Sequence, residues 1–514
     1  MTPDRRPPPL WPLALAFAAS LFLMRTEEQL YLLAIIIAAL CYAAARTFAA
    51  ATAPSASPPR HCEARSDAAI HAFAAMSRLA GRMDRHGPCG PRDDGETVPF
   101  AMTDDKAACT MNRAAGTPAL TLFVPTTPDT LLAVGALCVL FATVPFSTLP
   151  STSLVFAWIL GLFPLGYLLG LTALARGARW QRLELIAAAW IGFVAIWGVV
   201  EWLRFGDRSN GPFLDYNAFG ALFYLAVPPA FVALAQAQSL RARTLLIGFL
   251  AIALWALFAT CSRGATGILL LILGLLVAGL RRTQLPWRAP TAILLTLTGL
   301  AYGVVRHAPT HPVTREMVHL ATDQSTQDRL TMWRSALAMW RERPLLGQGL
   351  GSYKLHYLHY RSPAEITSTG DLAHNDYIQL LAEGGPLLPT LLVLAGIGTL
   401  ILALRLWRRL GPSCTPAACR AALAGWATAL PVLGLFLHAG VNFIFYVVPL
   451  ALLAGLMLAR ARHAAGPLPL RPIRLAAHPR LAGAAYVLVA SLAVSAITLD
   501  WLAAQAFNPA NHWP

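Results

Sequence analysis

The sequence predicts an all-α, polytopic membrane protein: a helical bundle of about 12–13 transmembrane helices with one large loop that contains short helices. Hydrophobic residues make up 56% of the 514 positions and charged residues only 13%, with a mean hydropathy of +0.55. A soluble domain would be about a quarter charged. Many apolar runs approach the roughly 20 residues that a bilayer-crossing helix needs. Helices are expected because backbone polar groups in lipid must bond within their own segment.

The apolar segments follow one another along the chain with short polar connections. They fall at residues 10–24, 30–45, 130–148, 153–174, 184–203, 218–236, 244–260, 266–280, 290–305, 386–407, 421–438, 443–460 and 481–499. The first two are short, so they are expected to tilt less or to lie partly in the membrane interface.

These segments divide the chain into five regions. We expect N-terminal spans at 1–46, a membrane core at 121–305 and C-terminal membrane helices at 386–514, with a long polar loop at 306–385. Residues 47–120 are dominated by Ala, Pro, Ser, Arg and Asp without a lasting apolar period, which predicts a disordered insert. A neutral insertion is favoured over a regulatory arm, because nothing in it resembles a packed element.

The net charge of +15 reflects loop arginines more simply than nucleic-acid binding, and no nucleic-acid partner is expected. Arginines gather in alternate loops. The richer set holds Arg5, Arg6, Arg46, Arg113, Arg176, Arg179, Arg182, Arg241, Arg243, Arg281, Arg282, Arg288, Arg408, Arg409, Arg420, Arg462, Arg471, Arg474 and Arg480. The bias puts that set, with the insert, in the cytoplasm, and the 306–385 loop on the outer face of the membrane. The eight cysteines include no close metal-ligand pair, since Cys414 and Cys419 are spaced too widely.

The long loop has local patterns of its own. Ser325 and Asp328 resemble a helix start, and an apolar stripe of Leu330, Trp333, Leu337 and Trp340 predicts a helix over 327–341 that rests its aromatic side on the bundle or the membrane interface. Pro344 ends it. The glycines at 347, 349 and 351 predict a turn, and a second short helix is expected from about Asn375 to Glu383.

His374 is the first candidate for chemistry, because imidazole titrates near neutral pH and suits proton transfer. Taken alone, a structural histidine at a helix start is the more common interpretation. Asn375 beside it could orient the ring or a sugar hydroxyl, and Asp376 suits a helix N-terminus.

Two arginines on the same expected face are candidate anion ligands. Arg263 sits in a tight turn between two spans, where the alternative is a side chain that reaches the headgroups. Arg329 lies at the start of the amphipathic helix, where a solvated arginine is the alternative. Guanidinium matches phosphate with two parallel donors. Asp215 and Asn217 are placed to line the outer mouth, or to cap the next span at Asn217.

Together, over residues 185–460, these segments resemble the O-antigen ligase and polysaccharide polymerase family of bacterial membrane glycosyltransferases. The resemblance rests on the order of its motifs. They are the Asn217 segment, Ser262-Arg263-Gly264, Asp328-Arg329-x-x-x-Trp333, Pro344-Leu345-Leu346-Gly347-x-Gly349-x-Gly351, and His374-Asn375-Asp376-Tyr377-x-Gln379-Leu380 with Glu383-Gly384. Some members carry a second histidine two residues before the matching one, where this chain has Leu372.

The resemblance implies an enzyme of the bacterial inner membrane whose active site faces the periplasm. It would move a glycan from undecaprenyl diphosphate to an acceptor hydroxyl, without a nucleotide sugar, a metal or another cofactor. His374 would be the base and Arg263 and Arg329 the diphosphate ligands, with Asn375, Asn217 and Asp215 lining the substrate site. A groove between spans would hold the polyprenyl tail, among membrane lipids.

The motifs leave the acceptor open. A lipid A core sugar, a growing polysaccharide and a protein Ser or Thr would correspond to an O-antigen ligase, a polymerase and a protein O-oligosaccharyltransferase, and the motifs do not separate them. A polysaccharide or lipid transporter is the alternative from another class, but it would place polar residues deep within the spans. A structural scaffold would not need the two arginines and the histidine.

Overall fold

The computed structural model describes residues 120–125, 127–175, 180–213, 215–307, 324–363, 365, 370–411, 414–466 and 470–475. The spans expected at 10–24, 30–45 and 481–499, and almost all of the expected insert at 47–120, lie outside these described residues.

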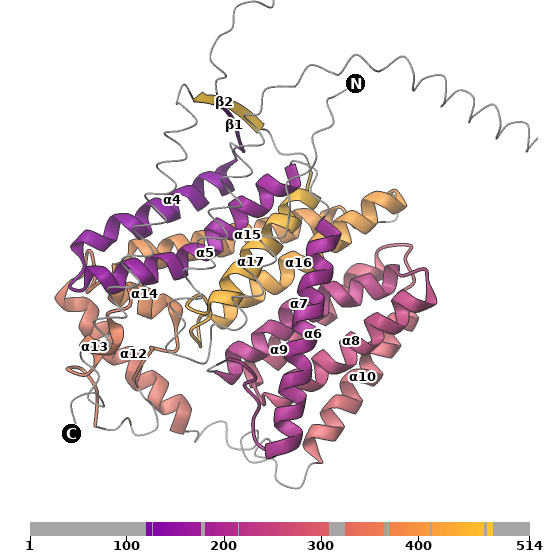
Figure 1. Ribbon diagram of the computed structural model, residues 1–514, viewed down its shortest axis with the longest axis horizontal. Helices are drawn as coiled ribbons and strands as arrows, with labels where there is room; N and C mark the ends of the chain where they lie inside the picture. Colours follow the sequence, from indigo (N-terminus) through magenta and orange to yellow (C-terminus); the bar gives the residue numbers. More distant parts are fainter. Residues whose placement is uncertain are drawn as a thin grey trace, which may run out of the picture.

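The described chain is a bundle of long apolar helices (Figure 1). Their bounds are α4 Pro128–Thr143, continued by the 3-10 turn η1 Val144–Phe146, α5 Pro150–Ala175, α6 Trp180–Phe205, α7 Tyr216–Gln236, α8 Leu240–Ala259, α9 Arg263–Arg281, α10 Arg288–Arg306, α15 Leu387–Arg408, α16 Pro416–His438 and α17 Val448–Ala464. Nine helices in the described part are long and apolar enough to cross a membrane, and α17 adds a shorter one of 17 residues. The predicted all-α polytopic bundle is confirmed.

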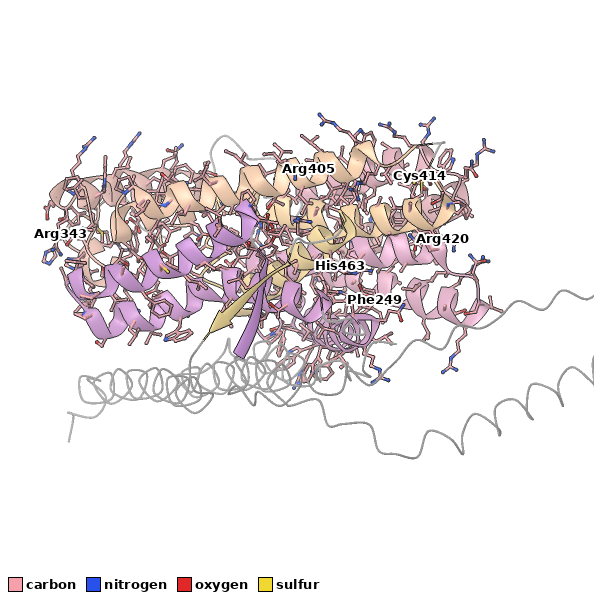
Figure 2. The ribbon with its side chains drawn as sticks, turned by 90° about the horizontal axis from the view of Figure 1, so that it is seen from above. Phe249, Arg343, Arg405, Cys414, Arg420 and His463 are labelled. Carbon is pink, nitrogen blue, oxygen red and sulfur yellow. The ribbon has the colours of Figure 1, made fainter. Side chains whose placement is uncertain are left out.

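Because successive helices alternate in direction, their connections gather at two ends of the bundle. One end, called the site end, collects the connections 206–215, 260–262 and 439–447 and the short helices of the long loop. The other, called the far end, collects the connections next to Arg241, Arg282 and Arg420. Figure 2 shows this separation, with Arg343 at one end of the bundle and Arg405, Cys414 and Arg420 towards the other.

Small residues let two of the helices approach closely. A Cβ at Gly455 of α17 would lie 2.2 Å from the Phe163 carbonyl oxygen of α5, and a Cβ at Gly170 would lie 2.7 Å from the Ala459 Cβ. Glycine at these positions therefore allows backbone contact, which is how helices associate in lipid. The helices α7 and α16 are the most deeply enclosed of the candidate spans.

Three shorter helices build the described part of the long loop: α12 Gln324–Glu342, α13 Tyr353–Tyr357 and α14 Asp376–Gly384. The expected helix at 327–341 therefore begins three residues earlier. Its buried face is not the stripe taken from the sequence, because Leu330 is exposed while Met332, Ala336 and Met339 pack against α13 and α14. Those two helices cover α12, and Trp340 is the member of the expected stripe that packs with them.

The glycine turn after α12 is a contact point between the loop and the bundle. Gly347, Gly349 and Gly351 all have positive φ, and a Cβ at Gly349 would lie 1.8 Å from the Ser147 Oγ. A Cβ at Gly351 would lie 2.2 Å from the Phe156 ring of α5. Only glycine combines this backbone with such close neighbours, so the turn ties the loop to η1 and α5.

One feature departs from the all-α class among the described residues. The strand β1, Leu120–Pro125, pairs antiparallel with β2, Leu470–Leu475, with Leu120 opposite Leu475. This two-stranded sheet joins the chain before α4 to the chain after α17.

Candidate active site

The sequence-predicted residues meet at the site end, where five segments converge. These are the loop before α14, the start of α12, the connection 439–447 between α16 and α17, and the starts of α7 and α9. The connection 439–447 lies at the centre, because each of the other segments except the start of α9 bonds to it directly.

His374 lies just before α14 with its backbone in the left-handed region, at φ 51°. Its Nδ1 is 3.1 Å from the Asn442 Oδ1, and its ring packs edge-on against Phe443 with centroids 4.9 Å apart. Burial lowers the pKa of His374 and the positive charge of Arg329 lowers it further, while Asp215 and the Asn442 hydrogen bond oppose them. The imidazole is therefore neutral at pH 7, the form that accepts a proton.

The residues after His374 fasten it to the connection. Asn375 caps α14, because its Oδ1 accepts from the Tyr377 and Ile378 amides, and its Nδ2 donates to the Gly440 carbonyl at 2.8 Å. Asn375 is also buried. These contacts hold the histidine's backbone, so we assign Asn375 a positioning role.

Two buried carboxyl groups of α14 also accept hydrogen bonds from the connection 439–447. The Asp376 Oδ2 accepts from the Ile444 and Phe445 amides, each at 2.9 Å. The Glu383 Oε2 accepts from the Tyr446 hydroxyl at 2.7 Å. Burial raises the pKa of Asp376 to about 8 and that of Glu383 to about 7. A carboxyl group with the Asp376 pKa is mostly protonated at neutral pH, which fits a structural role.

Arg329 reaches the same connection from α12. Its Nη1 donates to the Val441 carbonyl at 3.2 Å. One turn further on, the Trp333 Nε1 donates to the Ala373 carbonyl at 3.0 Å, next to the histidine. The short helix α12 thus places a guanidinium beside the imidazole through two backbone contacts.

Asp215, rather than Asn217, caps α7, so the alternative cap taken from the sequence is wrong. The Asp215 Oδ1 accepts from the Ala218 amide at 2.8 Å and from the Asn442 Nδ2 at 3.2 Å. Asn217 is buried in the first turn, where its Oδ1 accepts from the Ser262 hydroxyl at 2.8 Å. The reason for the shift is that α7 begins at Tyr216.

Arg263 is the first residue of α9 and is exposed, immediately after the capping residue Ser262. A helix N-terminus presents amide donors and the positive end of the helix dipole, so this position suits an anion. Its neighbour Gly264 lies over His438, whose Nε2 would be 3.0 Å from a Cβ there. His438 is buried, and its Nδ1 is 3.2 Å from the Tyr224 hydroxyl.

Sequence reasoning missed Asn442 and His438. His438 is the last residue of α16 and Asn442 lies within the connection 439–447, and each is exposed by 2% or less. The sequence did hold a signal for them, since a polar residue next to the ends of two apolar spans usually makes a hydrogen bond. It was hidden because their partners are more than 60 residues away in sequence.

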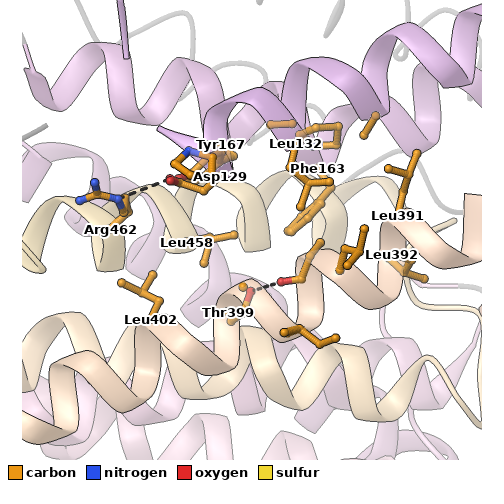
Figure 3. A pocket seen from close by; sticks show the side chains of 18 of the residues that line it. Asp129, Leu132, Phe163, Tyr167, Leu391, Leu392, Thr399, Leu402, Leu458 and Arg462 are labelled. Atoms are coloured by element: carbon orange, nitrogen blue, oxygen red, sulfur yellow. Dashed lines mark hydrogen bonds and ion pairs between the residues drawn. The ribbon is translucent and has the colours of Figure 1, made fainter. Parts of the chain in front are cut away.

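An apolar pocket of about 550 Å³ lies between α4, α5, α15 and α17 (Figure 3). Leu380 and Leu388 line it near the site end, and Asp129, Tyr167 and Arg462 line it near the far end. The Arg462 Nε is 3.4 Å from the Asp129 Oδ2, and the Tyr167 hydroxyl donates to the same carboxylate. None of the candidate site residues lines this pocket.

Among the residues that the structure describes, no three His, Cys, Asp or Glu side chains are grouped to hold a metal ion. The expectation that the reaction uses no metal stays a prediction.

Comparison with known proteins agrees with the motif order. Residues 248–392 match the family model described as O-antigen ligase. The matched part runs from within α8 into α15 and contains Arg263, Arg329, His374 and Asn375, but not Asp215, Asn217 or Asn442. No curated protein matches the chain. Over residues 248–392, this multi-pass helical membrane protein is thus similar to the O-antigen ligase family.

Proposed function

We propose that the protein transfers a glycan from undecaprenyl diphosphate to an acceptor hydroxyl at the periplasmic face of the bacterial inner membrane. The observation that carries the proposal is the pairing of a partly buried, neutral imidazole at His374 with the Arg329 guanidinium, both fixed to the connection 439–447. A base beside a fixed cation is what a hydroxyl attack with an anionic leaving group requires.

The reaction would proceed as a single displacement. His374 takes the proton of the acceptor hydroxyl while the hydroxyl oxygen bonds to the anomeric carbon. The bond from that carbon to the diphosphate oxygen breaks, and its electron pair leaves with undecaprenyl diphosphate. The diphosphate is stable as an anion and needs no general acid, in keeping with a carboxyl group at Asp376 that is buried and bonded to backbone amides.

Arg329 and Arg263 would bind the diphosphate from two helix starts. Both lie at the site end, Arg329 in the first turns of α12 and Arg263 at the N-terminus of α9. Bidentate guanidinium contacts would fix the anomeric carbon and stabilise the charge that develops on the leaving oxygen. The apolar lining of the pocket near Leu380 suits a hydrocarbon chain, and we propose it as a place for part of the polyprenyl tail.

The decisive experiment is transfer by the purified protein in lipid vesicles from an undecaprenyl-diphosphate glycan to separate acceptors. The three acceptors to compare are lipid A core, a second glycan chain and a Ser-rich protein, each with a chelator present. We expect transfer to one of them, with loss in the His374→Ala variant. Movement of the donor across the bilayer without transfer would instead support the transporter alternative.

Orientation is tested separately. In a cysteine-free background, Lys354→Cys lies at the site end and Arg243→Cys at the far end, and both native side chains are exposed. We expect a membrane-impermeant maleimide added to the periplasm to label only the first. Labelling of Arg243→Cys alone would reverse the proposed orientation.

A further inference from the structure

Three side chains from distant parts of the sequence form one hydrogen-bonded chain at the site. The His374 Nδ1 is 3.1 Å from the Asn442 Oδ1, and the Asn442 Nδ2 is 3.2 Å from the Asp215 Oδ1. Asn442 is almost wholly buried, at 1% exposure. The buried amide lies between an imidazole and a carboxylate, and its orientation decides what the imidazole can do.

The orientation of the amide follows from Asp215. Both oxygens of the Asp215 carboxylate accept hydrogen bonds, and the carboxylate is held in place as the cap of α7 by the Ala218 amide. It must therefore face the NH₂ group of Asn442, which leaves the amide oxygen facing His374. An amide oxygen can only accept, so the proton of the neutral imidazole is on Nδ1. The lone pair is then on Nε2.

We propose that Asn442 and Asp215 are positioning residues that hold His374 as its Nδ1–H tautomer, so that Nε2 is the atom that takes the acceptor proton. This inference rests on the proposed role of His374 as base. The same chain serves after proton transfer, because the imidazolium still donates from Nδ1 to the Asn442 oxygen, and the Asp215 carboxylate lies behind that amide.

Two further side chains extend this series of hydrogen bonds and hold the Asp215 carboxylate in place. The Asn217 Nδ2 donates to the Asp215 Oδ2 at 3.4 Å, and the Ser262 hydroxyl donates to the Asn217 Oδ1 at 2.8 Å. Ser262 is the cap of α9, directly before Arg263. The positioning chain thus ends beside the proposed diphosphate ligand, so that one set of side chains fixes both the base and the start of α9.

The tautomer is measured directly by ¹⁵N NMR of the full-length protein labelled with [¹⁵N]histidine in lipid vesicles at pH 7.5. The spectrum of His374→Gln identifies the resonances of His374 by difference. We expect a protonated Nδ1 and an unprotonated Nε2 in the wild-type protein. A protonated Nε2 would overturn the inference and leave the proposed function standing.

Kinetics of Asn442→Leu supply the second measurement, since Leu branches at Cγ as Asn does but offers no acceptor. We expect kcat to fall about 10–100-fold, as for other residues that orient an imidazole through a hydrogen bond, with the donor KM changed less than about twofold. Wild-type kcat in Asn442→Leu would overturn the inference. Activity in His374→Ala would instead overturn the proposed function.

The exchange variant Asn442→Asp with Asp215→Asn distinguishes positioning from mere packing. Asn at position 215 donates from its amide nitrogen to the new carboxylate, which accepts from Nδ1, and it gives up the contact with the Ala218 amide, because one oxygen of Asp215 makes both contacts. We expect kcat to recover relative to Asn442→Leu. The acid limb of the pH profile should move up by roughly one unit or more, because a carboxylate now touches the imidazole, with Arg329 the opposing charge. A folded exchange variant with neither recovery nor shift would contradict the inference.

Discussion

The Arg329 Nη1 donates a hydrogen bond to the carbonyl of Val441. The next residue is Asn442, whose side-chain oxygen contacts His374. A guanidinium proposed to bind diphosphate thereby also holds the connection that carries Asn442. The base and the anion ligand are consequently parts of one unit, and a shift of α12 would disturb both. Variants of Arg329 are therefore expected to affect the chemical step as well as donor binding.

The His374→Ala variant should lose glycan transfer by on the order of 10²–10⁴-fold, because a positioned base contributes a factor of that size. Donor binding, measured with labelled undecaprenyl-diphosphate glycan, should persist, since the arginines remain. His359→Ala is the matched control, because His359 is exposed on the loop away from the connection. Turnover by His374→Ala at the wild-type rate would remove His374 from the mechanism.

The variants Arg263→Lys and Arg329→Lys should each raise the donor Kd about 10–100-fold, the loss of one charge-assisted hydrogen bond. Lysine keeps the charge but offers no planar pair of donors. Arg334→Lys, on an exposed face of the same helix α12, should bind the donor normally. Equal affinity in all three variants would show that the diphosphate is bound elsewhere.

The acid limb of transfer should have its midpoint below pH 6.5. The reason is that burial and Arg329 lower the pKa of His374 below its ordinary value. Asp215→Asn removes the charge that opposes this shift and should move the acid limb to still lower pH. The measurement is kcat against pH at saturating donor, and an acid limb above pH 6.5 would contradict the prediction.

Two replacements of Asp376 distinguish the effect of its hydrogen bonds on protein stability from the effect of its ionisation. Its pKa is raised by burial from 3.8 to about 8, so its contribution to stability is fully present below about pH 3.8 and is lost as the pH rises through 8. Asp376→Asn keeps an acceptor for the Ile444 and Phe445 amides, and should flatten the decline of apparent Tm between pH 5 and 8.5. Asp376→Ala loses that acceptor and should be less stable than Asp376→Asn by about 1–3 kcal/mol at every pH. An unchanged pH dependence in the Asn variant would show that Asp376 is not the group that titrates.

The turn at Gly349 should tolerate no side chain. Gly349→Ala would place a Cβ 1.8 Å from the Ser147 Oγ at a φ of 115°, so the apparent Tm is expected to fall clearly. Gly267→Ala is the control, because nothing lies within 4 Å of its Cβ and Ala favours a helix. If both variants unfold at the same temperature, the turn is not a contact that holds the loop to the bundle.

The bundle could be predicted from the sequence because length and apolarity decide whether a segment crosses lipid. The segment expected at 218–236 is α7 at Tyr216–Gln236, and the one expected at 386–407 is α15 at Leu387–Arg408. The buried face of α12 could not be predicted in this way. Met332 and Met339 are covered by α13 and α14. The periodicity of a sequence does not tell which other helices will pack against a given helix.

Single motifs in the sequence selected the candidate residues of the site, but not the contacts between them. His374, Arg263 and Arg329 each stood out through a local pattern, and the structure places all three at the site end. Asn442 did not stand out, since its importance comes from contacts with Asp215 and His374, which lie far away in sequence. Hydrogen bonds between distant segments depend on helix packing, and only the fold reveals them.

The left-handed backbone of His374 has a consequence for how this residue could be replaced. A side chain with a Cβ costs roughly 1–2 kcal/mol in that conformation, whereas glycine costs nothing there. Glycine at position 374 should therefore give a more heat-resistant protein than alanine, with an empty space in place of the ring. Free imidazole added to the medium could enter that space and restore part of the transfer. The inactive His374→Gly variant would then be more stable than His374→Ala and could be switched on by a small molecule.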